Sequence, residues 1–194
     1  VPTSDVRDQF GRPLKDLRIS VTDRCNFRCR YCMPRERFSE NHTFLPKRAF
    51  LSFEEIEKVV RSCMSLGLEK VRITGGEPLL RKDLPRLIEM LSGLGIEIAL
   101  TTNASLLKKE AKALHSAGLT RVTVSLDALD PELHRTMADS NISVDSVLEG
   151  IDEAIRVGLS PVKINCVVQK GVNEEEVSKL VNHFRHTGVI VRFI

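Results

Sequence analysis

The sequence contains no apolar run that approaches the roughly 18 residues needed to cross a bilayer, and no segment with the basic start and apolar centre of a signal peptide. It also contains no internal repeat and no low-complexity stretch. We therefore expect no membrane partner, and a location in the cytoplasm, or in the mitochondrion if the source is eukaryotic. The length of 194 residues, of which 42% are hydrophobic, predicts one domain with its own core.

A strong charge imbalance is missing as well. Lys and Arg total 29 against 26 Asp and Glu, and the excess is scattered along the chain. A nucleic-acid-binding protein would usually show a clear basic cluster or stripe. We therefore expect no nucleic acid partner.

Cysteine, in contrast, is concentrated in one place. Three of the five cysteines fall in the stretch Cys25-Asn-Phe-Arg-Cys29-Arg-Tyr-Cys32. An odd number of cysteines, clustered in a chain without a secretory signal, favours a metal site over disulfides. Cys63 lies in a helical apolar pattern and Cys166 in a predicted strand, so we interpret both as small core residues.

Thiolates are the usual ligands of iron–sulfur clusters. Three thiolates would leave one iron of a four-iron cluster without a protein ligand, and chemistry could take place at that iron. The alternative is a zinc site, but zinc usually takes four ligands. His183 and His186 share a face of a predicted helix, where we expect them to be solvated, and they do not complete such a set.

The rest of the chain alternates between short runs rich in branched residues and helical patterns. Residues 1–16 are predicted to form a polar lead-in segment, and residues 33–51 an irregular connection. The predicted strands are residues 17–21, 70–74, 96–103, 122–127, 162–168 and 189–194. The predicted helices start at Ser52, which forms a capping box with Glu55, at Asp83, near residue 105, at Asp130-Pro131, near residue 145 and at Asn173. The inward face of the last helix is predicted to carry Val177, Leu180, Val181 and Phe184.

Six strands separated by helices imply right-handed parallel crossovers, in either a doubly wound sheet or a partial barrel. Side chains alternate between the two faces of a strand. One predicted face is apolar, with Val71, Ile73, Val122, Val124, Leu126, Val162, Ile164 and Cys166. The other is polar, with Arg18, Ser20, Lys70, Arg72, Thr74, Thr123, Ser125, Asp127, Lys163, Asn165 and Arg192.

The polar face gathers five cations, whereas a closed barrel fills its interior with branched apolar side chains. Burial of an unpaired charge costs on the order of several kcal/mol per ion. We therefore predict an open, incomplete parallel (βα)6 TIM-like barrel that holds an anionic ligand. The alternative is a solvated sheet face whose cations form salt bridges with nearby acids. Asp127 and Glu97 are too few to pair with five cations.

A second motif, Gly75-Gly-Glu-Pro78, follows the predicted strand at residues 70–74. Active sites of barrel folds lie where strands meet their following loops. Gly75 and Gly76 let the backbone approach a ligand, Glu77 can accept hydrogen bonds from a cationic ammonium group, and Pro78 stiffens the exit. By itself this tetrapeptide is an ordinary turn at the end of a strand.

Taken together, the Cys-x3-Cys-x2-Cys spacing, Tyr31 before the last cysteine and the Gly-Gly-Glu-Pro turn resemble the radical S-adenosylmethionine (SAM) enzymes. The resemblance implies that Cys25, Cys29 and Cys32 hold a 4Fe-4S cluster whose fourth iron binds the amino and carboxylate groups of SAM. In that family one electron from the cluster cleaves the sulfonium and yields a 5'-deoxyadenosyl radical.

Within the superfamily, the resemblance narrows to the GTP 3',8-cyclases of molybdenum cofactor biosynthesis. It rests on Asp8-x2-Gly-Arg12, on residues 17–24 leading into the cysteines, on Cys32-Met-Pro34, on residues 70–78 and on the closing Val-Arg-Phe-Ile194. It implies that Tyr31, Gly76 and Ser125 contact SAM. It also implies that GTP is contacted by Arg18, Arg72, Thr101 and Lys163, with Lys70 and Arg192 nearby.

Two departures from that family pattern are visible. The family usually has glycine after Thr-Thr-Asn, and here Ala104 follows Asn103. The family also carries a C-terminal domain with three more cysteines for a second 4Fe-4S cluster, and this chain stops at Ile194. We therefore expect the second-cluster domain to lie outside this chain, and the 194 residues alone to complete the reaction poorly.

The resulting hypothesis is a radical SAM lyase that cleaves SAM and converts GTP to 3',8-cyclo-GTP. We expect an electron donor as a further partner and a possible homodimer. The alternatives are a radical SAM enzyme for another substrate, such as a peptide, and a non-catalytic iron–sulfur or zinc module.

Overall fold

The computed structural model describes residues 6–39 and 41–194, so the first five residues of the predicted lead-in segment lie outside it. Its centre is a parallel sheet whose strand order follows the chain. The strands are β1 (Asp16–Ser20), β2 (Lys70–Thr74), β3 (Glu97–Thr102), β4 (Arg121–Ser125), β5 (Val162–Cys166) and β6 (Ile190–Phe193). Because β1 and β6 lie at opposite edges and do not pair, the sheet is open, and the predicted incomplete barrel is confirmed.

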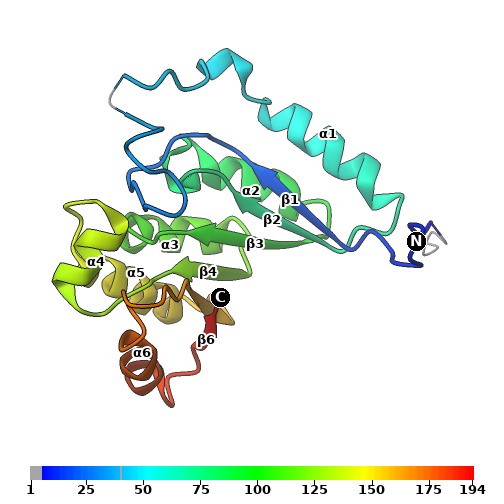
Figure 1. Cartoon of the computed structure of the whole chain (residues 1–194). Coiled ribbons are helices and arrows are strands. Elements are labelled where there is room, and N and C mark those ends of the chain that lie inside the picture. Colours follow the sequence, from blue (N-terminus) through cyan, green and yellow to red (C-terminus); the bar gives the residue numbers. More distant parts are fainter. Residues whose placement is uncertain (1–5, 40) are drawn as a thin grey trace.

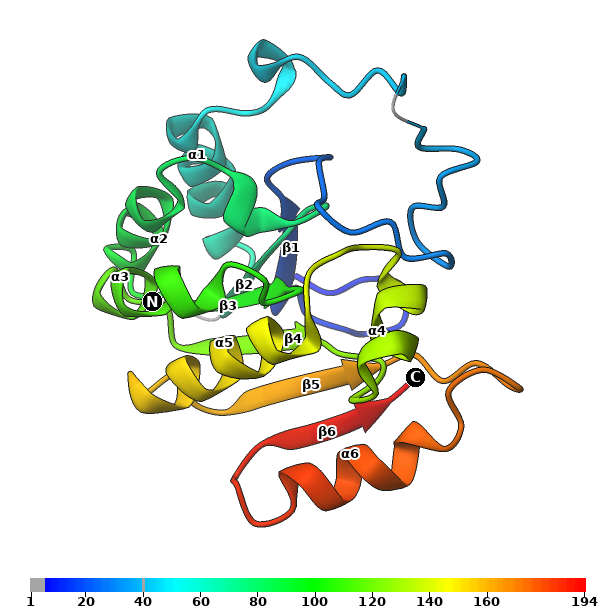
Figure 2. The same ribbon diagram turned by 90° about the vertical axis from the view of Figure 1, so that its left-hand side faces the viewer.

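Helices connect the strands and cover the sheet. They are α1 (Phe53–Met64), α2 (Leu84–Ser92), α3 (Leu107–Ser116), α4 (Pro131–Ala138), α5 (Val144–Arg156) and α6 (Glu176–Phe184), with 3-10 turns at Lys47–Ala49 and Pro78–Leu80. Neighbours pack along the series α1, α2, α3 and α5. Helix α4 contacts α5 and lies at the end toward which the strand arrows point (Figures 1 and 2).

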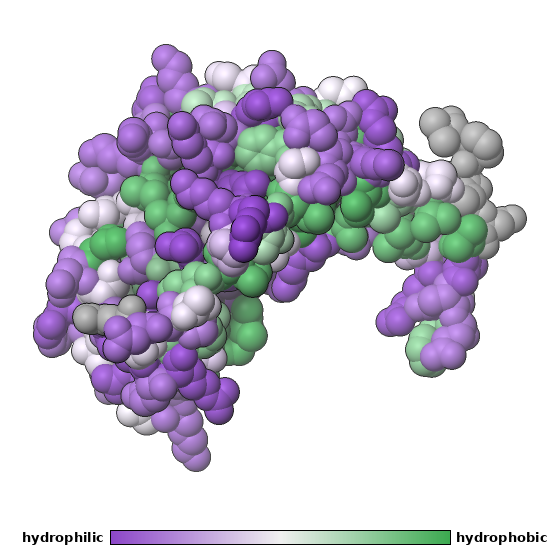
Figure 3. Space-filling view, turned by 90° about the horizontal axis from the view of Figure 1, so that it is seen from above, coloured by the Kyte–Doolittle hydropathy of each residue, from purple (hydrophilic) through white to green (hydrophobic). Residues whose placement is uncertain are grey.

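The core lies between the sheet and the helices. The predicted apolar strand residues are all buried there, as are the helix residues Leu87, Ile88, Leu107, Leu114 and Ile151. Helices α3 and α5 approach closely because α5 carries Gly150, where a Cβ would lie 2.8 Å from the Ala104 carbonyl oxygen. Seen from above, the surface is mostly hydrophilic, with apolar residues visible between the polar ones (Figure 3). No helix of the described residues is long and apolar enough to cross a membrane.

Three local predictions are wrong. Asp83 does not cap α2 with its side chain, because its backbone is left-handed with φ of 60° and a capping residue needs an extended backbone. Asn173 does not cap α6, because its side chain is buried and bonds to the ends of β4 and β5. Val181 does not face inward but is 45% exposed, since α6 buries a narrow stripe centred on Leu180 and Phe184.

The strand register arranges the polar face in rows across the sheet. Parallel partners in register point to the same face. One row contains Arg18, Arg72, Ala99 and Arg121. The next row toward the carboxyl ends contains Thr101, Thr123 and Lys163, and the one after it Ser125, Asn165 and Arg192. The cations and the cysteines that follow β1 therefore share one side of the molecule.

Candidate functional site

The cysteine loop, residues 21–38, leaves the carboxyl end of β1. Cys25, Cys29 and Cys32 line one cavity of about 210 Å³. The predicted site residues that line the same cavity are Tyr31, Gly75, Gly76, Glu77, Thr101 and Ser125. A second hollow of about 290 Å³ also touches all three cysteines. The fold thus brings the cysteines together with residues from the ends of β2, β3 and β4.

Cys29 and Cys32 belong to a single turn. The backbone N–H groups of Cys32 and Met33 both donate to the Cys29 carbonyl, at 2.9 and 2.8 Å. The loop is docked on α4, because Phe27 is buried edge-on against His134 and the Arg28 N–H donates to the Ala138 carbonyl. The turn is thereby held over the carboxyl ends of the strands.

Cys25 is held at a different place, the end of β3. The Asn103 side-chain amide lies 3.8 Å from the Cys25 sulfur and donates to Asn26 Oδ1 at 2.8 Å. The Asn26 amide in turn donates to the Ser105 hydroxyl at 2.9 Å. These contacts hold the first cysteine at the end of β3, and the Arg28 guanidinium, next to Cys29, also donates to the Cys25 carbonyl at 2.7 Å.

Gly75 and Gly76 allow the cysteine loop and the loop after β2 to pack closely together. The N–H of Gly76 donates to the Thr22 carbonyl and the N–H of Glu77 to the Arg24 carbonyl, both at 2.7 Å. A Cβ at Gly75 would lie 2.7 Å from the Thr22 oxygen, and a Cβ at Gly76 would collide with the Arg24 carbonyl. Glycine is therefore required here because the cysteine loop packs directly on the backbone after β2.

Glu77 is 1% exposed, and protein donors already surround its carboxylate. Oε1 accepts hydrogen bonds from the Thr102 hydroxyl at 2.7 Å and the Leu79 N–H at 3.0 Å, and Oε2 accepts one from the Asn103 N–H at 2.7 Å. Burial raises the pKa of Glu77, although these bonds oppose the rise. The carboxylate therefore ties the β2 loop to the end of β3, and its bond to an ammonium group stays a prediction.

Two of the three thiols, those of Cys25 and Cys29, favour the neutral form before a metal binds. Burial raises the pKa of Cys25, and burial together with the nearby Asp127 carboxylate raises the pKa of Cys29 to about 12. A thiolate is the form that ligates metal, so loading of this site must release protons.

Asp127 and His134 are cavity residues to which the sequence patterns assigned no function. The Tyr31 hydroxyl donates to the Asp127 carboxylate at 2.7 Å, and burial raises the pKa of both groups. His134 is 4% exposed, and its Nε2 has no hydrogen-bond partner among the described residues. Asp127 could have been noticed as a carboxylate at the end of a strand, whereas no local signal marks His134.

Most cations of the polar face form no ion pair with a carboxylate of the described residues. In the described part of the chain, Arg18, Arg72, Lys163 and Arg192 have no carboxylate partner, and Arg72 reaches only the Thr123 hydroxyl, at 3.4 Å. They do not line the 210 Å³ cavity. Uncompensated charge on a concave face favours an anionic ligand.

Lys70 differs from the sequence-based expectation. It pairs with Asp16 at 2.5 Å, because β1 begins one residue earlier than predicted and Asp16 lies opposite Lys70 in the register. Glu97 likewise forms an ion pair, with Arg121 on the same face. The expected group of five unpaired cations is therefore reduced to four.

The donor set fits an iron–sulfur cluster better than a single ion. Among residues 6–39 and 41–194, no three His, Cys, Asp or Glu side chains are arranged to hold a metal ion. A cluster offers each thiolate its own iron, so the thiols need to surround a cavity, whereas zinc needs ligands that converge on one point. Cys25, Cys29 and Cys32 do surround a cavity. Cys166 is buried as predicted, and Cys63 packs half-buried against the core.

Comparison with known proteins identifies the class. The family model of the Radical SAM superfamily matches residues 19–184. The chain therefore belongs to the radical SAM superfamily. Membership implies a 4Fe-4S cluster and SAM as its cofactors, in agreement with the cavity.

Individual relatives narrow the comparison. The chain is 54% identical over 194 residues to a GTP 3',8-cyclase of Acidothermus cellulolyticus, covering 99% of this chain and 54% of the relative. It is 52% identical over 191 residues to a GTP 3',8-cyclase of Staphylococcus carnosus, covering 97% of this chain and 56% of that relative. The chain thus spans about half the length of these relatives.

Solved structures agree on the fold. Streptococcus suis SuiB bound to S-adenosylmethionine superposes with a TM-score of 0.75 at 25% identity, over 93% of this chain and 40% of SuiB. The open parallel barrel is thus shared with a protein that binds SAM.

Proposed function

We propose that this chain is the SAM-cleaving part of a GTP 3',8-cyclase. The observation that carries the proposal is the juxtaposition of a three-cysteine cavity with four unpaired cations on one concave sheet face. A cluster held by Cys25, Cys29 and Cys32 would supply the electron for reductive cleavage of SAM, and the resulting radical chemistry would be directed at C3' of GTP so that C3' could bond to C8. The names of the relatives support the same reading.

The residues divide the task by position. Cys25, Cys29 and Cys32 hold the cluster, while Tyr31, Gly75, Gly76, Glu77 and Ser125 border SAM in the cavity that they line. Arg18, Arg72, Thr101 and Lys163 bind GTP, with Arg192 at the next row and Lys70 nearby, paired with Asp16. We infer from these positions that GTP would lie on the polar face beside the cavity, where the protein would shield the reacting carbon from water.

Anaerobic reconstitution with iron and sulfide tests the first half of this proposal. We expect a 4Fe-4S signal and, after reduction with SAM present, release of 5'-deoxyadenosine. Replacing Cys25, Cys29 or Cys32 by Ala should abolish both, whereas replacing Cys63 by Ala should preserve both. A protein that takes up no cluster would exclude the enzymatic reading and leave a non-catalytic module.

The substrate is tested separately by GTP binding. Arg72→Ala and Lys163→Ala each remove a charged donor, and hydrogen bonds to charged groups contribute about 1.5–3 kcal/mol, which is roughly ten- to hundredfold in affinity. Arg61→Ala on the exposed side of α1 is the matched control and should bind GTP normally. Unchanged affinity in both polar-face variants would favour another substrate, such as a peptide.

The proposal extends to partners beyond these residues. We expect a second 4Fe-4S cluster to engage guanine from a part of the protein outside this chain, since the relatives are nearly twice as long as the matched region. The reaction also needs a one-electron donor. A homodimer and a cytoplasmic or mitochondrial location remain proposals that gel filtration of the natural protein and fractionation of its source can test.

A further inference from the structure

A hydrogen bond from its tyrosine ties the cysteine turn to the sheet. Tyr31 lies between Cys29 and Cys32, and its hydroxyl donates to Asp127 Oδ2 at 2.7 Å. Tyr31 as a whole residue is 43% exposed, so burial holds its side chain only in part. A hydroxyl that donates to a carboxylate makes one of the stronger hydrogen bonds in proteins.

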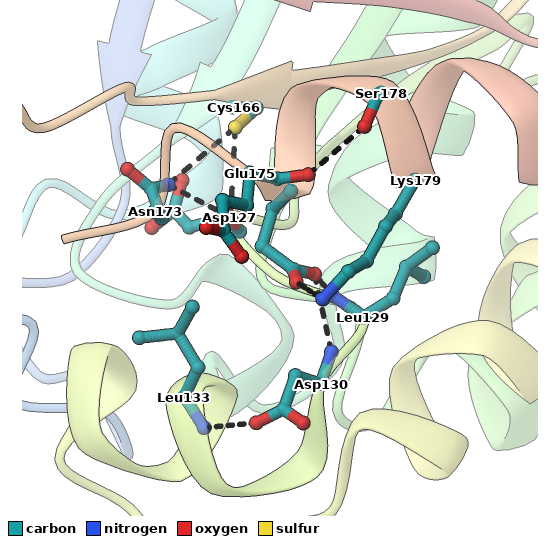
Figure 4. Close-up of polar contacts among 10 residues, drawn as sticks. Asp127, Leu129, Asp130, Leu133, Cys166, Asn173, Glu175, Ser178 and Lys179 are labelled. Carbon is teal, nitrogen blue, oxygen red and sulfur yellow. Dashed lines mark hydrogen bonds and ion pairs between the residues drawn. The ribbon is translucent and has the colours of Figure 1, made fainter.

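Asp127 is itself held from two further sides. Its other carboxylate oxygen accepts the Val167 N–H at 2.8 Å. Its carbonyl accepts the Asn173 side-chain amide at 2.8 Å, and the same amide reaches the Val167 carbonyl at 3.0 Å. Asn173 and Cys166 lie beside Asp127 in Figure 4. Asn173 is 1% exposed, so this junction of β4 and β5 is rigid.

Helix α6 secures the residues that follow. Glu176 is 1% exposed, and its Oε2 accepts the N–H groups of Leu129 and Asp130, at 2.5 and 3.2 Å. The labelled residues Leu129, Asp130 and Lys179 show this attachment in Figure 4. Asp127 is therefore a fixed point at the mouth of the barrel.

Besides the docking of the loop on α4 through Phe27 and Arg28, two side-chain contacts connect the cysteines to the ends of strands. Cys25 is attached to the end of β3 through Asn103, and the turn with Cys29 and Cys32 is attached to the end of β4 through Tyr31. We propose that Asp127 is a positioning residue that holds the Tyr31 hydroxyl and so sets the spacing between Cys25 and the Cys29–Cys32 turn around the cluster. The proposal rests on the proposed function for the identity of the cluster.

The first test uses the metal-free protein and the alkylation of its thiols. In Tyr31→Phe the ring stays and only the hydroxyl is lost. We expect Cys29 to react with iodoacetamide about tenfold faster than in the wild type, because the turn opens more often, while Cys25 reacts at an unchanged rate. Asn103→Ala should give the reverse pattern, with faster reaction at Cys25 alone. Equal rates at Cys29 in the wild type and Tyr31→Phe would overturn the inference.

The second test uses the reconstituted protein and the loss of its cluster to an iron chelator. Tyr31→Phe and Asp127→Asn should each lose the cluster several-fold faster, and the reduced cluster should give a broadened paramagnetic resonance signal. Residues that act through one hydrogen bond are not additive. The double variant should therefore lose its cluster no faster than whichever single variant loses it faster.

The outcomes separate this inference from the proposed function. A wild-type protein that takes up no cluster would overturn both. A wild-type protein that takes up a cluster, with Tyr31→Phe indistinguishable from it in both tests, would overturn the positioning role alone. Fully additive effects of Tyr31→Phe and Asp127→Asn would also contradict a shared hydrogen bond.

Discussion

At the residue scale, the site depends on two backbones that nearly touch. The glycines after β2 have no side chain because the carbonyls of Thr22 and Arg24 occupy that space. Ala104 shows the opposite case. It is fully buried with φ of 62°, a left-handed conformation that costs a non-glycine residue about 1–2 kcal/mol. Its methyl group packs in the core, and that burial offsets part of the cost.

Gly76→Ala is the sharpest residue-scale prediction. The new methyl would collide with the Arg24 carbonyl, so the cysteine loop must move away from the β2 loop. We expect the free energy of unfolding to fall by about 1–3 kcal/mol, as for other overpacked sites. Urea denaturation measures this change, and cluster uptake should fall in parallel.

The matched control is Gly93→Ala. A Cβ there would lie 3.4 Å from the nearest atom, and φ is −59°, so alanine fits. We expect no loss of stability and normal cluster uptake. If both alanine variants behaved alike, the close packing of the two loops would not be what requires glycine at Gly76.

At the element scale, α6 is fastened to the mouth of the barrel by one buried carboxylate. Burial favours a higher pKa for Glu176, but the Lys179 ammonium group and the N–H groups of Leu129 and Asp130 outweigh it and hold the pKa below its ordinary value of 4.5. The charged form is therefore more favourable in the folded protein than in the unfolded chain. The resulting stability is present above pH 4.5 and disappears as the pH falls through the lower, folded value.

Glu176→Gln tests this attachment. The amide cannot accept from all three donors, so we expect a loss of roughly 2 kcal/mol at pH 7, in the range of hydrogen bonds to charged groups. The gap between wild type and variant should narrow as the pH falls well below 4.5. Urea denaturation at several pH values measures both. Glu132→Gln, which breaks an exposed pair with Arg135, is the control and should leave the midpoint unchanged.

Most elements could be predicted from local patterns, and their ends could not. Alternation and helical spacing located every strand and every major helix, because half-buried elements must present one apolar face. The cap of α6 was misassigned for a tertiary reason. Asn173 is a suitable capping residue by type, but its amide forms hydrogen bonds with the buried carbonyls of Asp127 and Val167.

At the scale of the whole molecule, the open barrel concentrates positive charge on its concave face. Arg18 and Arg72 are direct neighbours in the register, and Lys163 and Arg192 follow on β5 and β6. Their mutual repulsion destabilises the ligand-free protein, and a polyanion relieves it.

Inorganic triphosphate should therefore stabilise the fold. A ligand at about 100 times its dissociation constant contributes about 2.7 kcal/mol, which corresponds to a rise in Tm of about 5–10 °C for a chain of this size. We expect the rise to shrink between low and physiological salt, because salt screens these charges. The Arg72→Ala variant should respond less at every salt concentration. No rise in Tm at low salt would contradict an anion site on this face.

The sequence by itself determined the thiol set, the succession of strands and helices along the chain and the strand face that carries the cations, because cysteine spacing and two-residue periodicity are local properties. The tertiary structure alone decided which charges are neutralised, since Asp16 meets Lys70, and Glu97 meets Arg121, only across paired strands. It also decided how the cysteines are held. Tyr31 and Asp127 are 96 residues apart, and no local pattern can report a hydrogen bond that exists only when the ends of β1 and β4 are brought together at the mouth of the barrel.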